Sequence, residues 1–232
     1  MKKIVIVLVL VVTGFSQAQS NSELVKHFEA YYKQMKVQGD VQGLMNGLTH
    51  LNILKPNQAT ADTLAYLYMS NNKHAQALNT IGIERKASDS DIALEVKAVC
   101  LKALNEVDKA IPHFEELFKR SPNVLIAYEL ADSSIQVNKL DEALQHIEYG
   151  IANSKDDIGI SFYETQYPYQ VKSKAAFTCL KALAKYREDQ VANLDVAMAL
   201  LDEALVIEPN FNMAKVSKEA LMAQKQKVVK KD

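Results

Sequence analysis

Apolar and small residues recur along this chain every 33 residues. The series Leu44, Ala77, Ala110 and Ala143 opens four apolar stretches, each of which follows a short polar turn. A second series lies one helical turn later and consists of Leu48, Ile81, Phe114 and Ile147. A third lies twelve residues before the first and consists of Tyr32, Ala65, Ala98 and Ala131. A fixed period of this size predicts stacked helix–turn–helix units that bury their apolar faces against one another.

The same pattern predicts an all-α fold of about five helix pairs followed by one end helix. Ala197, Leu201 and Ala204 repeat the second-helix pattern after an insertion, so a fifth pair is expected. The expected helices are 21–38 with 41–54, 58–70 with 74–85, 90–104 with 107–120, 123–137 with 140–153 and 168–188 with 191–207, and then 211–227. They form repeat units at roughly 21–56, 57–88, 89–121, 122–155 and 166–209.

Two segments of the chain resemble the tetratricopeptide repeat family. The turn in Asn138–Leu144 and the segment Ala204–Asn210, with its sequence Ile-Glu-Pro-Asn, look like that family's turn and its closing segment. The period of 33 residues is also close to the family's period of about 34. The resemblance implies an α-solenoid of about five repeats with a C-terminal capping helix. It also implies a scaffold that binds another protein, and not an enzyme.

Four positions depart from the pattern of that family. Tyr32 and Leu44 stand where the family usually has small residues. Lys97 replaces an expected leucine, and Glu84 stands at another site where a small residue is usual. We expect these residues to change the spacing of particular helices and to leave the architecture intact.

Residues 1–18 have the three parts of a secretory signal peptide. Two lysines give a positive start, Ile4–Val12 is an apolar run, and Ser16–Ala18 is a small-x-small cleavage site. The apolar run is shorter than the roughly 20 residues that cross a membrane. We therefore expect an exported protein of bacterial type, periplasmic or secreted, with its repeat domain at 19–232. The alternative is a short buried strand.

Charge and cysteine content narrow the function classes. Without the two N-terminal lysines, 25 basic residues stand against 28 acidic ones, which gives no electrostatic reason to bind nucleic acid or an anionic membrane. Cys100 and Cys179 fall on helical stretches two repeat units apart. A disulfide needs Cα atoms within about 7 Å, so we expect two buried free thiols.

No motif in the sequence indicates catalysis. There is no glycine-rich phosphate loop, no H-E-x-x-H, no G-x-S-x-G and no C-x-x-C. His113 and His146 lie at equivalent repeat positions, and paired imidazoles can bind a transition metal. No carboxylate or cysteine completes such a site, so we expect two solvent-facing histidines. The sequence predicts a binding protein without catalytic residues, cofactor or metal.

The first helices of successive pairs line a concave groove in a repeat stack. Aromatic and methionine side chains with scattered charges on that face suit an extended peptide or the helix of another protein. We therefore predict that another protein or peptide binds in this groove, against Lys33, Tyr66, Met69, Glu95, Val99, Lys102, Tyr128 and Asp132.

The segment 160–169 breaks the period. It has no helix signal before Pro168, and it contains Phe162, Tyr163, Tyr167 and Tyr169. Long irregular segments in compact domains tend to be functional or disordered, and the aromatic residues argue against disorder. Two interpretations stay open, an arm that contacts a ligand or packing over the fifth pair. The alternative function is a binding component for a small ligand or a polymer that uses this segment.

Overall fold

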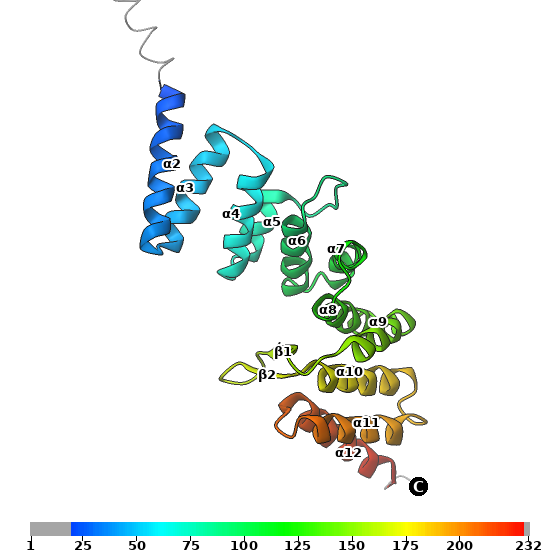
Figure 1. Cartoon of the computed structure of the whole chain (residues 1–232). Coiled ribbons are helices and arrows are strands. Elements are labelled where there is room, and N and C mark those ends of the chain that lie inside the picture. Colours follow the sequence, from blue (N-terminus) through cyan, green and yellow to red (C-terminus); the bar gives the residue numbers. More distant parts are fainter. Residues whose placement is uncertain (1–19, 230–232) are drawn as a thin grey trace, which may run out of the picture. The chain divides into compact units, whose positions relative to one another are not determined.

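The computed structural model describes residues 20–229, which divide into two compact units (Figure 1). Unit 1 ends at Leu104 and unit 2 begins at Asn105, so the predicted repeat at 89–121 is divided between them. The predicted signal peptide at 1–18 lies outside the described residues. None of the helices in the described part is long and apolar enough to span a membrane.

The predicted all-α architecture is confirmed within the described residues. Unit 1 contains α2 (Ser20–Gln38), α3 (Val41–Leu54), α4 (Gln58–Ser70), α5 (His74–Ile81) and α6 (Asp91–Ala103). Unit 2 contains α7 (Val107–Arg120), α8 (Val124–Gln136), α9 (Leu140–Asn153), β1 (Gly159–Phe162), β2 (Tyr169–Lys172), α10 (Ser173–Glu188), α11 (Leu194–Ile207) and α12 (Asn212–Val229). The helices pack in pairs, α2 with α3 and α4 with α5 in unit 1, and α8 with α9 and α10 with α11 in unit 2. The end helix α12 packs on α11.

One backbone conformation recurs in the turns with the period of the sequence. Gly39, Asn72, Asn105 and Asn138 have φ angles of 69°, 58°, 63° and 60°, in the left-handed region. Glycine and asparagine adopt this conformation at the lowest cost, and it is the usual way to end a helix. The polar turns therefore reverse the chain within a few residues, which sets the second helix of each pair against the first.

The helix starts and the core follow from side-chain chemistry. Asp40, Asn57 and Asn123 each accept a hydrogen bond from a backbone N–H three residues later, at 2.9 Å. Such caps satisfy amides that have no partner inside the helix. The small residues of the repeat pattern allow close helix contacts, and most are fully buried: Ala65, Ala77, Ala98, Ala110, Ala131 and Ala143.

The loop between α5 and α6 explains two departures from the repeat pattern. Helix α5 ends at Ile81 and not at 85, because Gly82 turns the chain with a φ of 81°. Lys97 is fully buried, and its Nζ donates to the carbonyl of Glu84 and to the carboxylate of Asp89, both at 2.7 Å. Lys97 therefore holds the loop that Glu84 belongs to. The two unusual residues form one structural feature.

A β-hairpin lies where an irregular segment and an early helix start were predicted. We call Gly159–Lys172 the hairpin. Its strands pair antiparallel, with Ile160 opposite Val171 and Phe162 opposite Tyr169. Helix α10 consequently begins at Ser173 and not at 168. Four residues a strand are too few for an alternating pattern to stand out in a sequence.

Candidate functional site

Five of the predicted binding residues lie on α4 and α6, two helices of unit 1 that pack side by side. They are Tyr66, Met69, Glu95, Val99 and Lys102. Tyr66 is 43% exposed, Glu95 is exposed, and the side chains of Met69, Val99 and Lys102 are partly buried. Ile92, which the sequence analysis did not select, stands three residues before Glu95 and is 45% exposed. Residues three and seven apart share one side of a helix. We call Tyr66, Met69, Ile92, Glu95, Val99 and Lys102 the first-helix face.

A buried hydrogen-bond bridge holds the two helices of this face together. Asp62 on α4 is 3% exposed and accepts bonds from Gln58 Nε2 and Ser90 Oγ, both at 2.6 Å. Ser90 also caps α6, since its Oγ accepts from the amide of Ala93 at 3.0 Å. The start of α6 is thereby fixed against α4, and the first-helix face rests on a bonded frame.

Lys33, also predicted to bind a partner, is exposed on α2. Helix α2 packs on α3, whereas it has no extensive contact with α4 among the described residues. The structure therefore does not bring Lys33 onto the first-helix face.

Of the two binding residues predicted in unit 2, Tyr128 is covered by the hairpin. Tyr128 on α8 contacts Phe162 of β1 and Phe177 of α10 edge to face, with ring centroids 6.1 and 5.7 Å apart. Burial, and then the nearby Asp132 carboxylate, raise the pKa of the Tyr128 hydroxyl above its ordinary value. Asp132 is itself partly buried and accepts a bond from Gln136 Nε2 at 2.8 Å. Tyr128 is a packing residue and not an open groove residue.

The strand pair next to the turn, Phe162 and Tyr169, is firmly anchored in unit 2. Phe162 stacks on Tyr169 at 5.5 Å and touches Phe211, with ring centroids 4.9 Å apart. The backbone N–H of Met213 donates to the Tyr169 hydroxyl at 3.2 Å, and that hydroxyl donates to Glu164. Burial, and then the bond to Glu164, raise the pKa of Tyr169 to about 12. For these two aromatic residues, the packing interpretation is confirmed.

The tip of the hairpin projects instead. Tyr163 and Tyr167 are 75% and 76% exposed. The hydroxyl of Thr165 donates to the carbonyl of Tyr167 at 2.6 Å, which orders the turn between them. The predicted aromatic segment thus divides into two packed rings in the last strand pair and two exposed rings in the turn that follows it.

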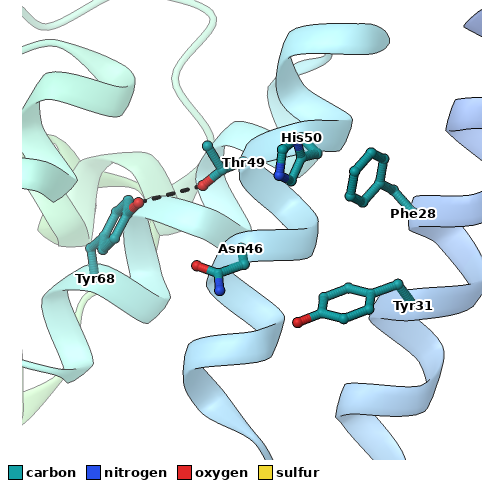
Figure 2. A pocket seen from close by; sticks show the side chains of 6 residues that line it. All are labelled: Phe28, Tyr31, Asn46, Thr49, His50 and Tyr68. Carbon is teal, nitrogen blue, oxygen red and sulfur yellow. Dashed lines mark hydrogen bonds between the residues drawn. The ribbon is translucent and has the colours of Figure 1, made fainter.

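Unit 1 also contains a pocket that the sequence did not predict. It has a volume of about 350 Å³ and lies where α2, α3 and α4 meet (Figure 2). We call it the aromatic–polar pocket, and its lining residues are Phe28, Tyr31, Asn46, Thr49, His50 and Tyr68.

The side chains of this pocket are ordered by one another. The rings of Phe28 and His50 stack, with centroids 4.0 Å apart and planes at 11°. Thr49 Oγ1 donates to the carbonyl of Met45 at 2.7 Å and lies 3.5 Å from the Tyr68 hydroxyl. Figure 2 shows Tyr31 and Tyr68 reaching toward α3 from opposite sides.

The pocket lies beside a close contact between α2 and α3. Gly43 and Gly47 face α2, since a Cβ at Gly43 would clash with the Met35 side chain and one at Gly47 would lie 3.2 Å from the Tyr31 ring and 3.3 Å from the Tyr32 Cβ. The glycine pair, four residues apart, was the available sequence signal.

The remaining predicted residues carry no site. His113 is buried, so the expectation of a solvent-facing side chain was wrong for it, while His146 is partly buried with its ring edge-on to Phe118 at 5.2 Å. Burial lowers the pKa of His146. Among residues 20–229, no three His, Cys, Asp or Glu side chains gather as metal ligands would. The predicted burial of Cys100 and Cys179 is confirmed, and burial raises the pKa values of their thiols to about 11 and about 12.

Comparison with known proteins identifies the fold. No protein-family model matches the sequence, and no curated protein matches it. The solved structure of YrrB, "a TPR protein with an unusual peptide-binding site", is similar with a TM-score of 0.65, at 13% identity over 87% of this chain and 99% of that one. The structure of MamA is similar with a TM-score of 0.59, at 16% identity over 81% of this chain and 93% of that one. The chain has the fold of tetratricopeptide repeat proteins.

Proposed function

We propose that this protein is an exported, non-enzymatic scaffold that binds a peptide or protein through the first-helix face of unit 1. One observation carries the proposal: Tyr66 and Ile92 are each more than two-fifths exposed on two helices that pack together. Exposed aromatic and aliphatic side chains beside charged ones are typical of surfaces that bind proteins. The similar structure of YrrB is titled for a peptide-binding site, which agrees with this class of partner.

The chemistry of the face defines the kind of peptide that fits. The ring of Tyr66 and the side chain of Ile92 offer apolar contacts, while Glu95 and Lys102 add one charge of each sign. An amphipathic segment with apolar side chains three or four residues apart matches this arrangement. Partner binding is expected to depend on a few apolar side chains, as at most protein interfaces.

The test compares two paired variants in affinity capture from the cell envelope. Tyr66→Ser with Ile92→Ser removes the apolar contacts of the first-helix face and should abolish capture of the partner. Val196→Ser with Val206→Ser alters apolar positions on α11 that are at least as exposed and should leave capture unchanged. A photoreactive residue at position 95 should crosslink to the captured partner. If both paired variants still capture the partner, the proposal is wrong.

The exposed hairpin tip supports the second candidate function, binding of a small ligand or polymer. Only Tyr163 and Tyr167 of the aromatic segment are open to such a ligand. Capture lost with Tyr163→Ser and Tyr167→Ser, and retained with the first-helix variants, would favour this alternative.

Export rests on the sequence of residues 1–18. Expression of the full chain in a bacterial host, followed by mass spectrometry of the N-terminus, tests it. The expected product begins at Gln19 and is found in the periplasm or the medium. An intact N-terminus in the cytoplasm would contradict export.

A further inference from the structure

We propose that the aromatic–polar pocket of unit 1 is a binding site for a neutral sugar ring. The pocket is separate from the first-helix face. Tyr66 belongs to that face and Tyr68 to the pocket, and two residues along a helix differ by roughly 200° in direction. A ligand in the pocket therefore leaves the first-helix face open to a partner.

The lining offers no carboxylate, ammonium or guanidinium group to a ligand. None of the six side chains is an aspartate, glutamate, lysine or arginine. A carboxylate, an ammonium ion or a phosphate would find no such charge partner among them. The ligand that suits this lining is uncharged.

The lining supplies hydrogen-bond groups that have capacity to spare. The Tyr31 hydroxyl has no hydrogen-bond partner within the described residues. Asn46 accepts from Gln42 Nε2 at 2.9 Å through its Oδ1, which leaves its NH₂ group available to donate. The Thr49 and Tyr68 oxygens are 3.5 Å apart, so their mutual bond is weak and a ligand hydroxyl can join it.

The aromatic rings distinguish a sugar from an aromatic side chain of a partner. One face of the Phe28 ring is already covered by His50, stacked at 4.0 Å. Five of the six lining side chains carry a polar group, so a purely apolar ring would leave donors and acceptors unmet. A sugar ring presents C–H groups to aromatic rings and hydroxyls to the polar groups around them. The volume of about 350 Å³ is at the small end for ligand pockets, which suits one or two sugar rings.

The experiment is a titration of the purified, isotope-labelled protein followed by NMR. The probes are glucose, galactose, N-acetylglucosamine and their disaccharides, each raised to about 20 mM, which detects dissociation constants in the millimolar range. We expect at least one probe to shift the Asn46 side-chain NH₂ signal and the ring signals of Tyr31 and Tyr68. The amide signals of Ile92 and Glu95 on the first-helix face should not move.

Two substitutions connect the signal to the pocket. Tyr31→Phe removes a single hydroxyl and keeps the ring, and Asn46→Ala removes the amide; each should weaken binding roughly 3- to 10-fold. Tyr66→Phe, on the other side of α4, is the matched control and should bind as the parent does. Circular dichroism melting confirms that each variant is folded.

Three results would overturn the proposal. The first is that no saccharide shifts the pocket signals. The second is a saccharide shift that Tyr31→Phe and Asn46→Ala leave unchanged. The third is a shift caused by N-acetyltyrosine amide and by no sugar, which would identify the pocket as a receptor for an aromatic side chain.

Discussion

The two units carry the same repeat pattern but present their first helices differently. In unit 1 the first-helix face is open, with Tyr66 and Ile92 on its surface. In unit 2 Tyr128, the repeat equivalent of Glu95, lies against Phe162 of the hairpin, whereas Leu125, the equivalent of Ile92, stays 54% exposed. The insertion between α9 and α10 thus covers one position of this face. Repeat register alone does not determine which helix faces are free to bind.

The departures from the repeat pattern mark where unit 1 differs. Lys97 pairs with Asp89 and fixes the loop that leads into α6, one of the two helices of the first-helix face. Gly43 and Gly47 let α2 pack closely on α3 beside the aromatic–polar pocket. In unit 1 the unusual residue Lys97 fixes a loop, whereas in unit 2 the inserted hairpin covers Tyr128.

The largest expected effect comes from removing the buried lysine of unit 1. Lys97→Ala leaves the Asp89 carboxylate buried without its cation, and breaking such a pair costs about 3–5 kcal/mol. Chemical denaturation should show this loss in the free energy of unfolding. Hydrogen exchange should speed up in residues 82–103, while the helices of unit 2 keep their protection.

A double variant is the control for this prediction. Lys97→Leu with Asp89→Ala removes both charges, so much of the lost free energy of unfolding should return. If Lys97→Ala alone lowers the free energy of unfolding by less than about 1 kcal/mol, the Lys97–Asp89 pair does not hold the loop before α6 in place.

The next effect tests the difference between the units directly. Phe162→Ala removes a buried ring from the hairpin and should cost about 3 kcal/mol, at the lower end for a buried phenylalanine. The hairpin amides should then lose their exchange protection, and Tyr128 should become exposed. The α8 surface around Tyr128 would then be uncovered, next to the already exposed Leu125.

The exposed tip supplies the matched control for Phe162→Ala. Tyr163→Ala should change stability by no more than about 0.5 kcal/mol and leave the hairpin closed. Retained protection at Val171 in Phe162→Ala would show that the ring does not hold the hairpin over Tyr128.

Much of the fold could be predicted from the sequence because local chemistry and tertiary packing agree. The bounds predicted for α3, α4, α7 and α9 match the structure, and each is flanked by a polar turn or a proline that a helix cannot continue through. The end of α5 was missed, because a single glycine and the distant Lys97 determine it together. A single sequence shows such residues as exceptions without showing that they touch.

The candidate site was less predictable, for a physical reason. Spacing gives the side of a helix on which a residue lies, so the exposure of Tyr66 and Glu95 could be predicted. It does not reveal what covers that side, so Tyr128 was assigned to an open groove. The aromatic–polar pocket is lined by side chains from three helices, and no periodic pattern encodes how these come together.

A smaller effect compares one close helix contact in each unit. In unit 2, a Cβ at Gly150 would clash with the ring of Phe177, which is fully buried and cannot move aside. Gly150→Ala should therefore cost about 1–3 kcal/mol. In unit 1, a Cβ at Gly47 would lie 3.2 Å from the Tyr31 ring, which can shift, and 3.3 Å from the Tyr32 Cβ, which moves only with α2.

Gly47→Ala should accordingly cost less than Gly150→Ala, since its contacts are longer and alanine is favoured over glycine in a helix by roughly 0.5–1 kcal/mol, which offsets part of the crowding. Thermal melting of both variants measures the difference. Equal losses would mean that α2 lies on α3 as rigidly as α10 lies on α9. The space beside α2 would then be fixed and not adjustable to a ligand.

The smallest effect is a pH dependence confined to unit 2. Folding raises the pKa of Tyr169 from 10.0 to about 12, through burial and the bond to Glu164. The neutral hydroxyl therefore contributes stability that is fully present below pH 10 and is lost as the pH rises toward 12. Other groups also titrate there, so Tyr169→Phe is the reference. The difference in tyrosinate absorbance between the two proteins should have its midpoint near pH 12, and the hairpin should loosen over that range in the parent alone. A midpoint near 10 would mean that Tyr169 is solvated, and that the hairpin over the unit 2 face opens freely at neutral pH.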